Sequence, residues 1–295
     1  MQYILDAIKS KDRKKIILDT DAYNEVDDQF AIAYAMLAPE TIELLSINAA
    51  PFLNSRSQSP KEGMEKSYDE IFNIINLVDP TRKIPVFKGS EHFLQNKTTP
   101  AESEAADNII NTVRSSKEKI FVVAIGAITN VASAIIKDPD IINNMVVIWL
   151  GGHALHHEHT REFNLYQDVD AAKVVFDSRV PLSVIPCAGV CDYLTTTIPE
   201  LEYYLAGKNK LCDYLFDIVK NYTNNPYCWS KTLWDVSAIA LLDLPESMNA
   251  VVIPTPILTG EGYFARDDGR HPFIYIRRLD RDKIFGRLFE KLTAL

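Results

Sequence analysis

Short apolar runs typical of strands alternate along this chain with longer segments of helical character. Most of the runs are continuous in Val, Ile and Leu, as expected for strands covered on both faces. The predicted strands are Lys15–Asp19, Ile42–Ala49, Ile84–Phe87, Ile120–Gly126, Met145–Gly151, Leu182–Pro186, Val251–Ile253 and Phe273–Ile276. The predicted helices are Val26–Leu37, Glu62–Val78, Glu102–Arg114, Asn130–Lys137, Val169–Ser178, Asn209–Tyr222, Leu233–Leu242 and Arg281–Leu292. This alternation predicts an α/β fold with a mainly parallel, Rossmann-like central sheet and helices on both faces.

No repeat, low-complexity tract or linker interrupts the chain, so we expect one domain over residues 1–295. The net charge of −9 disfavours nucleic acid and anionic membranes as partners, because both bind clustered Lys and Arg. The N-terminal stretch MQYILDAIKSKDRKK does not read as a signal peptide. The four cysteines form no Cys-x-x-Cys pair, and we expect reduced thiols. These features predict a cytoplasmic protein that acts on a small molecule.

The loop after the first predicted strand concentrates negative charge. Ligands bind beyond the carboxyl ends of the strands in such sheets, so this loop is a candidate site. It carries Asp19, Asp21, Asp27 and Asp28 within ten residues. Carboxylates packed behind a buried strand repel one another unless a cation offsets them, and Ca²⁺ and Mg²⁺ prefer such oxygen ligands. The alternative is a set of capping and loop residues on a solvated edge.

The same stretch resembles the N-terminal signature of the inosine–uridine preferring nucleoside hydrolase family, Asp-Thr-Asp-Pro-Gly-x-Asp-Asp. Here AYNEV separates the two Asp pairs, five residues where the signature has three. The resemblance implies the nucleoside hydrolase fold, a homodimer or homotetramer, and calcium-dependent cleavage of ribonucleosides to free base and ribose. It implies that Asp21 is the general base and a calcium ligand, that Asp28 binds calcium and that Asp27 binds ribose. Asp19 would hold Asp21 in place.

Later segments resemble further parts of the family's pattern. IELLSINAAPFLN resembles the run that leads to a ribose-contacting Asn, which implies Asn54, with Asn48 as the alternative. AIGAITNVASAI resembles a segment whose Thr carbonyl binds calcium, which implies Thr129; on its own it is a common helix start. REFNLYQDVDAAKVV implies that Glu162 and Asn164 bind ribose hydroxyls, whereas a simple Asn turn before a helix would explain the same letters.

TLWDVSAIALL resembles the family's late His-Asp helix start. It implies that Asp235 is the last calcium ligand and contacts the ribose 3′-hydroxyl. Many relatives carry His before this Asp as the general acid, but Trp234 stands here, as in the purine-preferring branch. Stacking on a nucleobase is worth about 1–3 kcal/mol. This Trp-Asp variant favours purine substrates; the alternative is a core tryptophan.

The segment HALHHEHTRE holds four of the six histidines. A zinc site and a solvated loop are both open readings, although the spacing fits no standard zinc pattern. His156 stands six places before Glu162, where the family usually has a ribose-binding Asn, so we predict that His156 binds ribose or protonates the leaving base. His92 and Phe93 are further candidates for contact with the base.

Two other functions are compatible with parts of the sequence. Asp-Thr-Asp after a strand is also found in haloacid-dehalogenase-type phosphatases, which would use Mg²⁺. That alternative leaves Glu162, Asn164 and Asp235 without a role. A non-catalytic nucleoside- or sugar-binding protein on the same fold would explain the longer first loop and the missing His. The presence of Asp21 argues against it.

Overall fold

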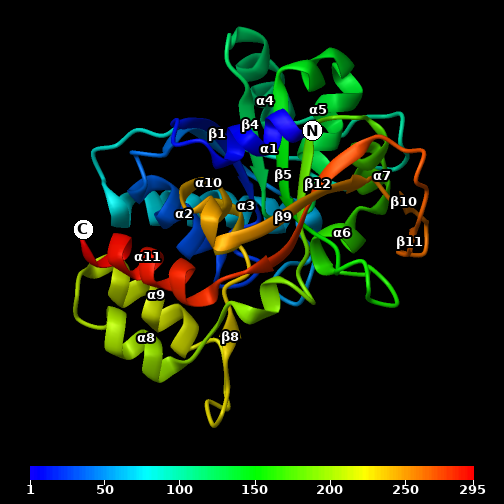
Figure 1. The fold of residues 1–295 in the computed structure, drawn as a ribbon. Coiled ribbons are helices and arrows are strands. Elements are labelled where there is room, and N and C mark those ends of the chain that lie inside the picture. The colour runs from blue at the N-terminus through cyan, green and yellow to red at the C-terminus, as the bar shows by residue number, and fades with distance from the viewer.

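An eight-stranded sheet organises the chain (Figure 1). The computed structural model describes all 295 residues. Its spatial strand order is β3-β2-β1-β4-β5-β6-β12-β9. The strands are β1 (Lys14–Thr20), β2 (Ile42–Ala49), β3 (Val86–Phe87), β4 (Ile120–Ala124), β5 (Met145–Leu150), β6 (Leu182–Ile185), β9 (Met248–Pro254) and β12 (Pro272–Leu279). Only the β12–β9 pair is antiparallel, so the predicted mainly parallel sheet is confirmed.

Helices connect most of the strands. The α-helices are α1 (Gln2–Lys9), α2 (Asp28–Leu37), α3 (Pro60–Val78), α4 (Glu104–Ser115), α5 (Thr129–Lys137), α6 (Phe163–Gln167), α7 (Val169–Asp177), α8 (Ile198–Leu205), α9 (Lys210–Lys220), α10 (Val236–Asp243) and α11 (Arg281–Thr293). Short 3-10 helices span Pro139–Asn143, Cys191–Tyr193 and Pro245–Ser247. Two small antiparallel pairs join β7 (Thr195–Thr196) to β8 (Lys231–Thr232) and β10 (Ile257–Leu258) to β11 (Phe264–Ala265).

The side chains of each strand alternate between two hydrophobic cores, one on either face of the sheet. Ile16 and Leu18 of β1 pack with α1, α2, α3, α8, α9, α10 and α11, whereas Ile17 packs on the other face with α4, α5 and α7. Both faces are therefore covered by helices, as predicted. This explains why the strands read as continuous apolar runs.

All eight predicted strands belong to the main sheet, and the predicted helices are present with small shifts of their ends. Helices α1, α6 and α8 were not predicted, because all three are short and have few buried apolar side chains. All four cysteines are free, and three of them are buried. None of the helices is both long and apolar enough to cross a membrane.

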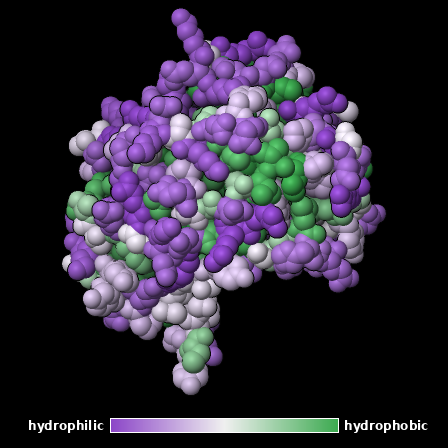
Figure 2. All heavy atoms as spheres, viewed as in Figure 1, coloured by the Kyte–Doolittle hydropathy of each residue, from purple (hydrophilic) through white to green (hydrophobic).

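The outer surface is largely hydrophilic in the view of Figure 2. An apolar area interrupts it near β9 and β12, where Val251–Ile253 of the edge strand β9 are only partly buried. A loop below β8 projects from the body in both views and carries Tyr227, which is 84% exposed.

The strand order reverses between β1 and β4, which creates a crevice at the carboxyl ends of these two strands. From β1 the chain runs outward to β2 and β3, then returns to β4 on the other side of β1. Ligands bind at such a switch point, beyond the carboxyl ends of the two central strands. Asp19 pairs in register with Ala124, so the aspartate loop after β1 lies beside the turn after β4.

Candidate active site

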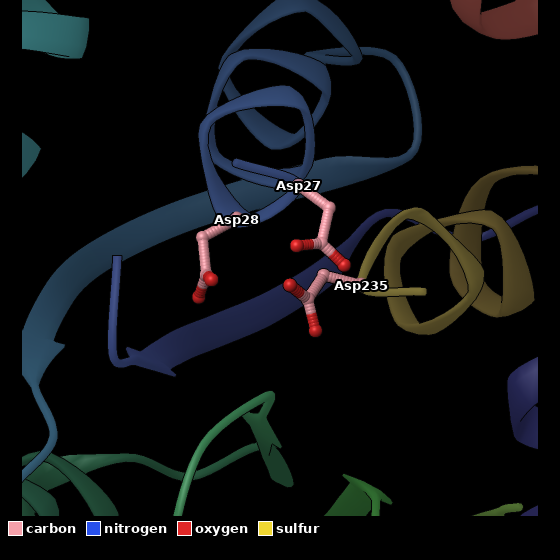
Figure 3. Close-up of side chains that lie close together, drawn as sticks. All are labelled: Asp27, Asp28 and Asp235. Atoms are coloured by element: carbon pink, nitrogen blue, oxygen red, sulfur yellow. The ribbon is translucent and has the colours of Figure 1, made fainter. Parts of the chain in front are cut away.

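Three carboxylates converge at this crevice (Figure 3). Asp27 and Asp28 stand at the start of α2, and Asp235 directly precedes α10. One ligand atom from each carboxylate lies within 4.8 Å of the other two. The three residues are 2%, 1% and 4% exposed. The fold thus brings two parts of the chain that are distant in sequence into one group able to hold a metal ion.

Asp21 lies next to this group and has no partner of its own. It is fully buried, and neither oxygen of its carboxylate makes a hydrogen bond. It approaches Gly126 in the turn after β4: a Cβ atom at Gly126 would lie only 3.0 Å from Asp21 Cγ. A side chain at position 126 would therefore force Asp21 to shift by a few tenths of an ångström.

Burial and mutual repulsion raise the pKa values of these acids. Burial, reinforced by Asp27, raises the pKa of Asp28 to about 7. Burial also raises the pKa of Asp21 well above its usual range, with further contributions from Asp28, Asp27 and Glu162. The pKa of Asp235 is raised by burial and then by Asp27, Asp28 and Asp21. Full ionisation of the group therefore requires added positive charge.

Lys231 of β8 supplies part of that charge and was not recognised in the sequence. Its ammonium pairs with Glu25 and lies 3.6 Å from Asp27 Oδ1. Its side chain is 6% exposed, and the two carboxylates keep its pKa above the usual value in spite of burial. A lone Lys in a polar stretch carries no sequence signal for this contact, because only the packing of β8 against the α2 loop creates it.

A short series of hydrogen bonds links Asp19 to Asn130 and, through Asn130, to Ser90. Asn130 Nδ2 donates to Asp19 Oδ2 at 3.0 Å, and Asn130 Oδ1 accepts from the backbone N–H and the hydroxyl of Ser90 at 2.9 Å each. Burial raises the pKa of Asp19 to about 7. No hydrogen bond joins Asp19 to Asp21, so the support of Asp21 by Asp19 stays a prediction.

The long first loop bulges without separating the aspartates. The Asn24 N–H donates to the Asp21 carbonyl at 2.7 Å, which closes a turn. Tyr23 packs under the Arg56 guanidinium, 4.5 Å from the ring centre, and Glu25 turns towards Lys231. The extra residues thus make contacts outside the carboxylate group.

A cavity of about 460 Å³ opens beside the carboxylates, within the size range of small-molecule sites. Its lining includes all six residues predicted to bind substrate: Asp27, Asn54, Glu162, Asn164, Trp234 and Asp235. Asn24, Glu25, His153, Cys187 and Tyr222 also line it and were not predicted as site residues. The structure therefore gathers these side chains from six separate segments of the chain around one cavity.

The comparisons with known proteins agree with this geometry. Residues 16–283 match the family described as inosine-uridine preferring nucleoside hydrolase. The chain belongs to this nucleoside hydrolase family. It is 28% identical over 273 residues to a probable uridine nucleosidase 2 of Arabidopsis thaliana, with 85% of this chain and 81% of that protein covered. It is 27% identical over 251 residues to the non-specific ribonucleoside hydrolase RihC of Klebsiella pneumoniae (strain 342), with 79% and 80% covered.

Solved structures share the fold of this nucleoside hydrolase. A purine-preferring ribonucleoside hydrolase from Gardnerella vaginalis has a TM-score of 0.79 at 23% identity, covering 95% of this chain and 98% of that one. An inosine-uridine preferring nucleoside hydrolase from Bacillus anthracis has a TM-score of 0.72 at 17% identity, covering 96% and 100%. The chain is thus a hydrolase acting on N-glycosyl compounds, in place of the phosphatase and the non-catalytic binding protein considered above.

Glu162 and Asn164 of this nucleoside hydrolase are fixed by backbone groups. Glu162 caps α6, accepting from the N–H groups of Asn164 and Leu165 at 2.9 and 3.0 Å, and from Gly152 N–H at 2.8 Å. Asn164 Nδ2 donates to the carbonyls of Ile125 and Leu150. The amide oxygen of Asn164 is left free to accept a hydrogen bond at the cavity.

The two candidate asparagines after β2 occupy different places. Asn54 lines the cavity, where its amide donates to Asn24 Oδ1 at 2.6 Å. Asn48 is buried in β2, where its side-chain Oδ1 accepts a hydrogen bond from Asn108 Nδ2 at 3.0 Å. Asn54 is therefore the one in reach of a ligand.

Thr129 begins α5 and is buried away from the cavity lining. Its hydroxyl donates to Asp168 Oδ2 at 2.7 Å. That hydrogen bond ties α5 to the start of α7 and leaves the side chain unavailable as a ligand. Only the carbonyl of Thr129 can serve the predicted role.

Trp234 contributes both its backbone and its ring. Its N–H donates to Asp27 Oδ2 at 3.0 Å, while its partly buried side chain lines the cavity. Trp234 also packs against the larger hydrophobic core. Trp234 is therefore part of both the core and the cavity wall, and its stacking on a nucleobase stays a prediction.

The structure does not bring His156 to this cavity. His156 is exposed and lines a separate depression with Leu155, Gly189 and Tyr275. His153 lines the carboxylate cavity instead. His92 is exposed, and neither it nor Phe93 lines the cavity. The four histidines of this loop include no group of three ligand atoms close enough together to hold a metal.

Proposed function

We propose that this enzyme hydrolyses ribonucleosides to free base and ribose, with Ca²⁺ held by Asp21, Asp28, Asp235 and the Thr129 carbonyl. The observation that carries the proposal is Asp21, a buried carboxylate without any hydrogen-bond partner. It lies beside a group of three further carboxylates, of which Asp27 and Asp235 line a small-molecule cavity. Leaving such a group unsatisfied is costly unless a ligand completes it.

The donor set favours a hard cation. Every candidate ligand atom is an oxygen, which suits Ca²⁺ or Mg²⁺ and disfavours zinc. Three carboxylates and a backbone carbonyl are more protein ligands than the octahedral, partly hydrated Mg²⁺ usually takes, which favours the larger Ca²⁺. When bound, Ca²⁺ lowers the pKa of a coordinated water and attracts ribose hydroxyls.

The protein's own residues would perform the remaining chemistry. Breaking the glycosidic bond leaves positive charge on C1′ and the ring oxygen, and the surrounding carboxylates stabilise it. Asp21 would take a proton from the attacking water, since neither oxygen of its carboxylate is occupied by a hydrogen bond from the protein. Asp27 would accept from a ribose hydroxyl, and Asn164 Oδ1 from another.

The base preference is proposed to lean towards purines. Trp234 at the cavity wall can stack on the larger purine ring, and no histidine precedes Asp235 to protonate a pyrimidine. The names of the relatives give different preferred nucleosides, so the proposed purine preference depends on Trp234 in the cavity wall. Replacing Trp234 with Ala should lower kcat/KM for inosine by about 5- to 150-fold and lower it less for uridine.

Release of reducing sugar from a panel of nucleosides, with and without a calcium chelator, tests the proposal. We expect ribose from inosine, loss of activity in the chelator, and recovery on adding Ca²⁺ but not on adding Mg²⁺ alone. Ribose release that is indifferent to the chelator would overturn the metal assignment. Absence of release from every nucleoside would overturn the function.

A further inference from the structure

The side chain of His153 takes no part in the chemistry proposed for Asp21, Asp27 and Asn164. His153 follows β5 and the Gly152 turn and lines the cavity together with Trp234 and Asp235. Its ring makes no hydrogen bond to the protein, and Nδ1 is buried without a partner. A buried ring nitrogen without a partner is uncommon, because an unmet polar group costs about 1–3 kcal/mol.

The backbone around His153 is fixed on both sides. The Gly152 N–H donates to Glu162 Oε2 at 2.8 Å, and the His153 N–H donates to Thr160 Oγ1 at 2.9 Å. Gly152 has φ of 75°, in the left-handed region that favours glycine. The returning segment 160–162 therefore holds the imidazole in the cavity wall, whereas residues 155–158 remain exposed.

We infer that His153 contacts the nucleobase beside Trp234 and donates a hydrogen bond to it as the glycosidic bond breaks; this inference rests on the proposed function. The carboxylates around Asp27 and Asp235 suit the hydroxyls of ribose, which are hydrogen-bond donors. The nitrogen and oxygen acceptors of a nucleobase require a donor instead. Among the side chains of the cavity wall outside the carboxylate group, the imidazole offers an N–H that no protein atom uses.

The imidazole acts in this scheme as a neutral donor. Burial lowers its pKa, the neighbouring His157 and His159 lower it further, and Asp192 opposes them. Their rings lie 5.5 and 5.8 Å from that of His153. In the reaction the C1′–N bond breaks and its electron pair stays on the base. The His153 N–H stabilises that charge, while water gives its hydroxyl to C1′ and its proton to Asp21. Asp21 then releases this proton to solvent, and solvent protonates the base.

A pair of substrates separates this role from a structural one. Inosine needs help with its leaving base, whereas 4-nitrophenyl ribofuranoside releases a phenolate that is stable without a donor. We expect His153→Ala to lower kcat/KM for inosine by about 100-fold and to change that for the nitrophenyl riboside by less than about 3-fold. His153→Asn and His153→Gln keep an N–H near one or the other ring nitrogen, and at least one should recover a tenth or more of the wild-type rate on inosine.

Two further histidine variants complete the design. His92→Ala is the matched control, since it removes an exposed imidazole that does not line the cavity, and it should change the rate on neither substrate. His156→Ala tests the assignment made from sequence spacing. Equal losses on both substrates at His153, no loss there, or a larger loss at His156, would each overturn the inference. Because wild-type turnover is measured first, failure of the proposed function is seen separately, as absence of ribose from any nucleoside.

Discussion

The ammonium of Lys231 lies 3.6 Å from Asp27 Oδ1, and the two side chains are 6% and 3% exposed. β8 thus brings a permanent cation to the edge of the carboxylate group. Lys231 also pairs with Glu25 of the lengthened first loop. The extra loop residues therefore anchor the cation that offsets part of the buried negative charge.

Removing this cation should destabilise the metal-free protein. Lys231→Met would leave Asp27 buried without its nearest positive partner, and breaking a buried pair costs about 3–5 kcal/mol. Urea denaturation at pH 7.5 in chelator should show a loss of this size, and saturating Ca²⁺ should offset part of it, because the ion binds the folded state. Lys231→Arg keeps the charge and should lose less than half as much. Equal stability of Lys231→Met and wild type would contradict the pairing.

Stability of the metal-free protein should fall as pH rises. The pKa values of Asp19 and Asp28 are raised from 3.8 to about 7, so the folded state binds more protons than the unfolded state between these values. Stability is therefore highest below about pH 4, decreases up to about pH 7 and then levels off with respect to these groups. Denaturation in metal-free buffer across this range measures the slope. Asp28→Asn should reduce the slope, and an unchanged slope in that variant would argue against the assignment.

Replacing the proposed base should separate activity from folding. Asp21→Asn is close in shape, and its effect on kcat should be about 10²- to 10⁴-fold, the usual contribution of a general base. The same change removes a repelling charge, so the melting temperature in chelator should rise. Asp217→Asn, at an exposed position of α9, is the control and should alter neither quantity. Wild-type turnover by Asp21→Asn would remove Asp21 from the mechanism.

The contact between Gly126 and Asp21 should be intolerant of one methyl group. In Gly126→Ala the new Cβ would meet Asp21 Cγ at 3.0 Å and Ala50 Cβ at 3.2 Å. Overpacking of this kind costs about 1–3 kcal/mol, and displacement of Asp21 should also weaken calcium binding. Calorimetric titration with Ca²⁺ and thermal unfolding measure the two effects. Gly286→Ala in α11, where a Cβ meets nothing within 4 Å, should instead stabilise the protein by about 0.5–1 kcal/mol.

Much of the fold could be read from local patterns. The eight runs predicted as strands all entered the main sheet, because continuous apolar runs between helical segments have few other stable arrangements. The six residues predicted to bind substrate all line one cavity, because each follows a strand or begins a helix at the same edge of the sheet. Short elements such as α1 were missed, since its eight residues make only about two helical turns, too few for an apolar pattern to repeat.

What the sequence determined by itself was the alternation of strands and helices and the presence of polar loops with a nucleoside hydrolase pattern. The tertiary structure alone decided which side chains meet. Lys231 reaches Asp27, and His153 rather than His156 faces the cavity, because strand order and loop path depend on contacts between residues far apart in the chain. The spacing of residues in the sequence cannot predict such contacts. A single turn changes the direction of the side chains that follow it, and here that turn is at Gly152, held by hydrogen bonds to Thr160 and Glu162.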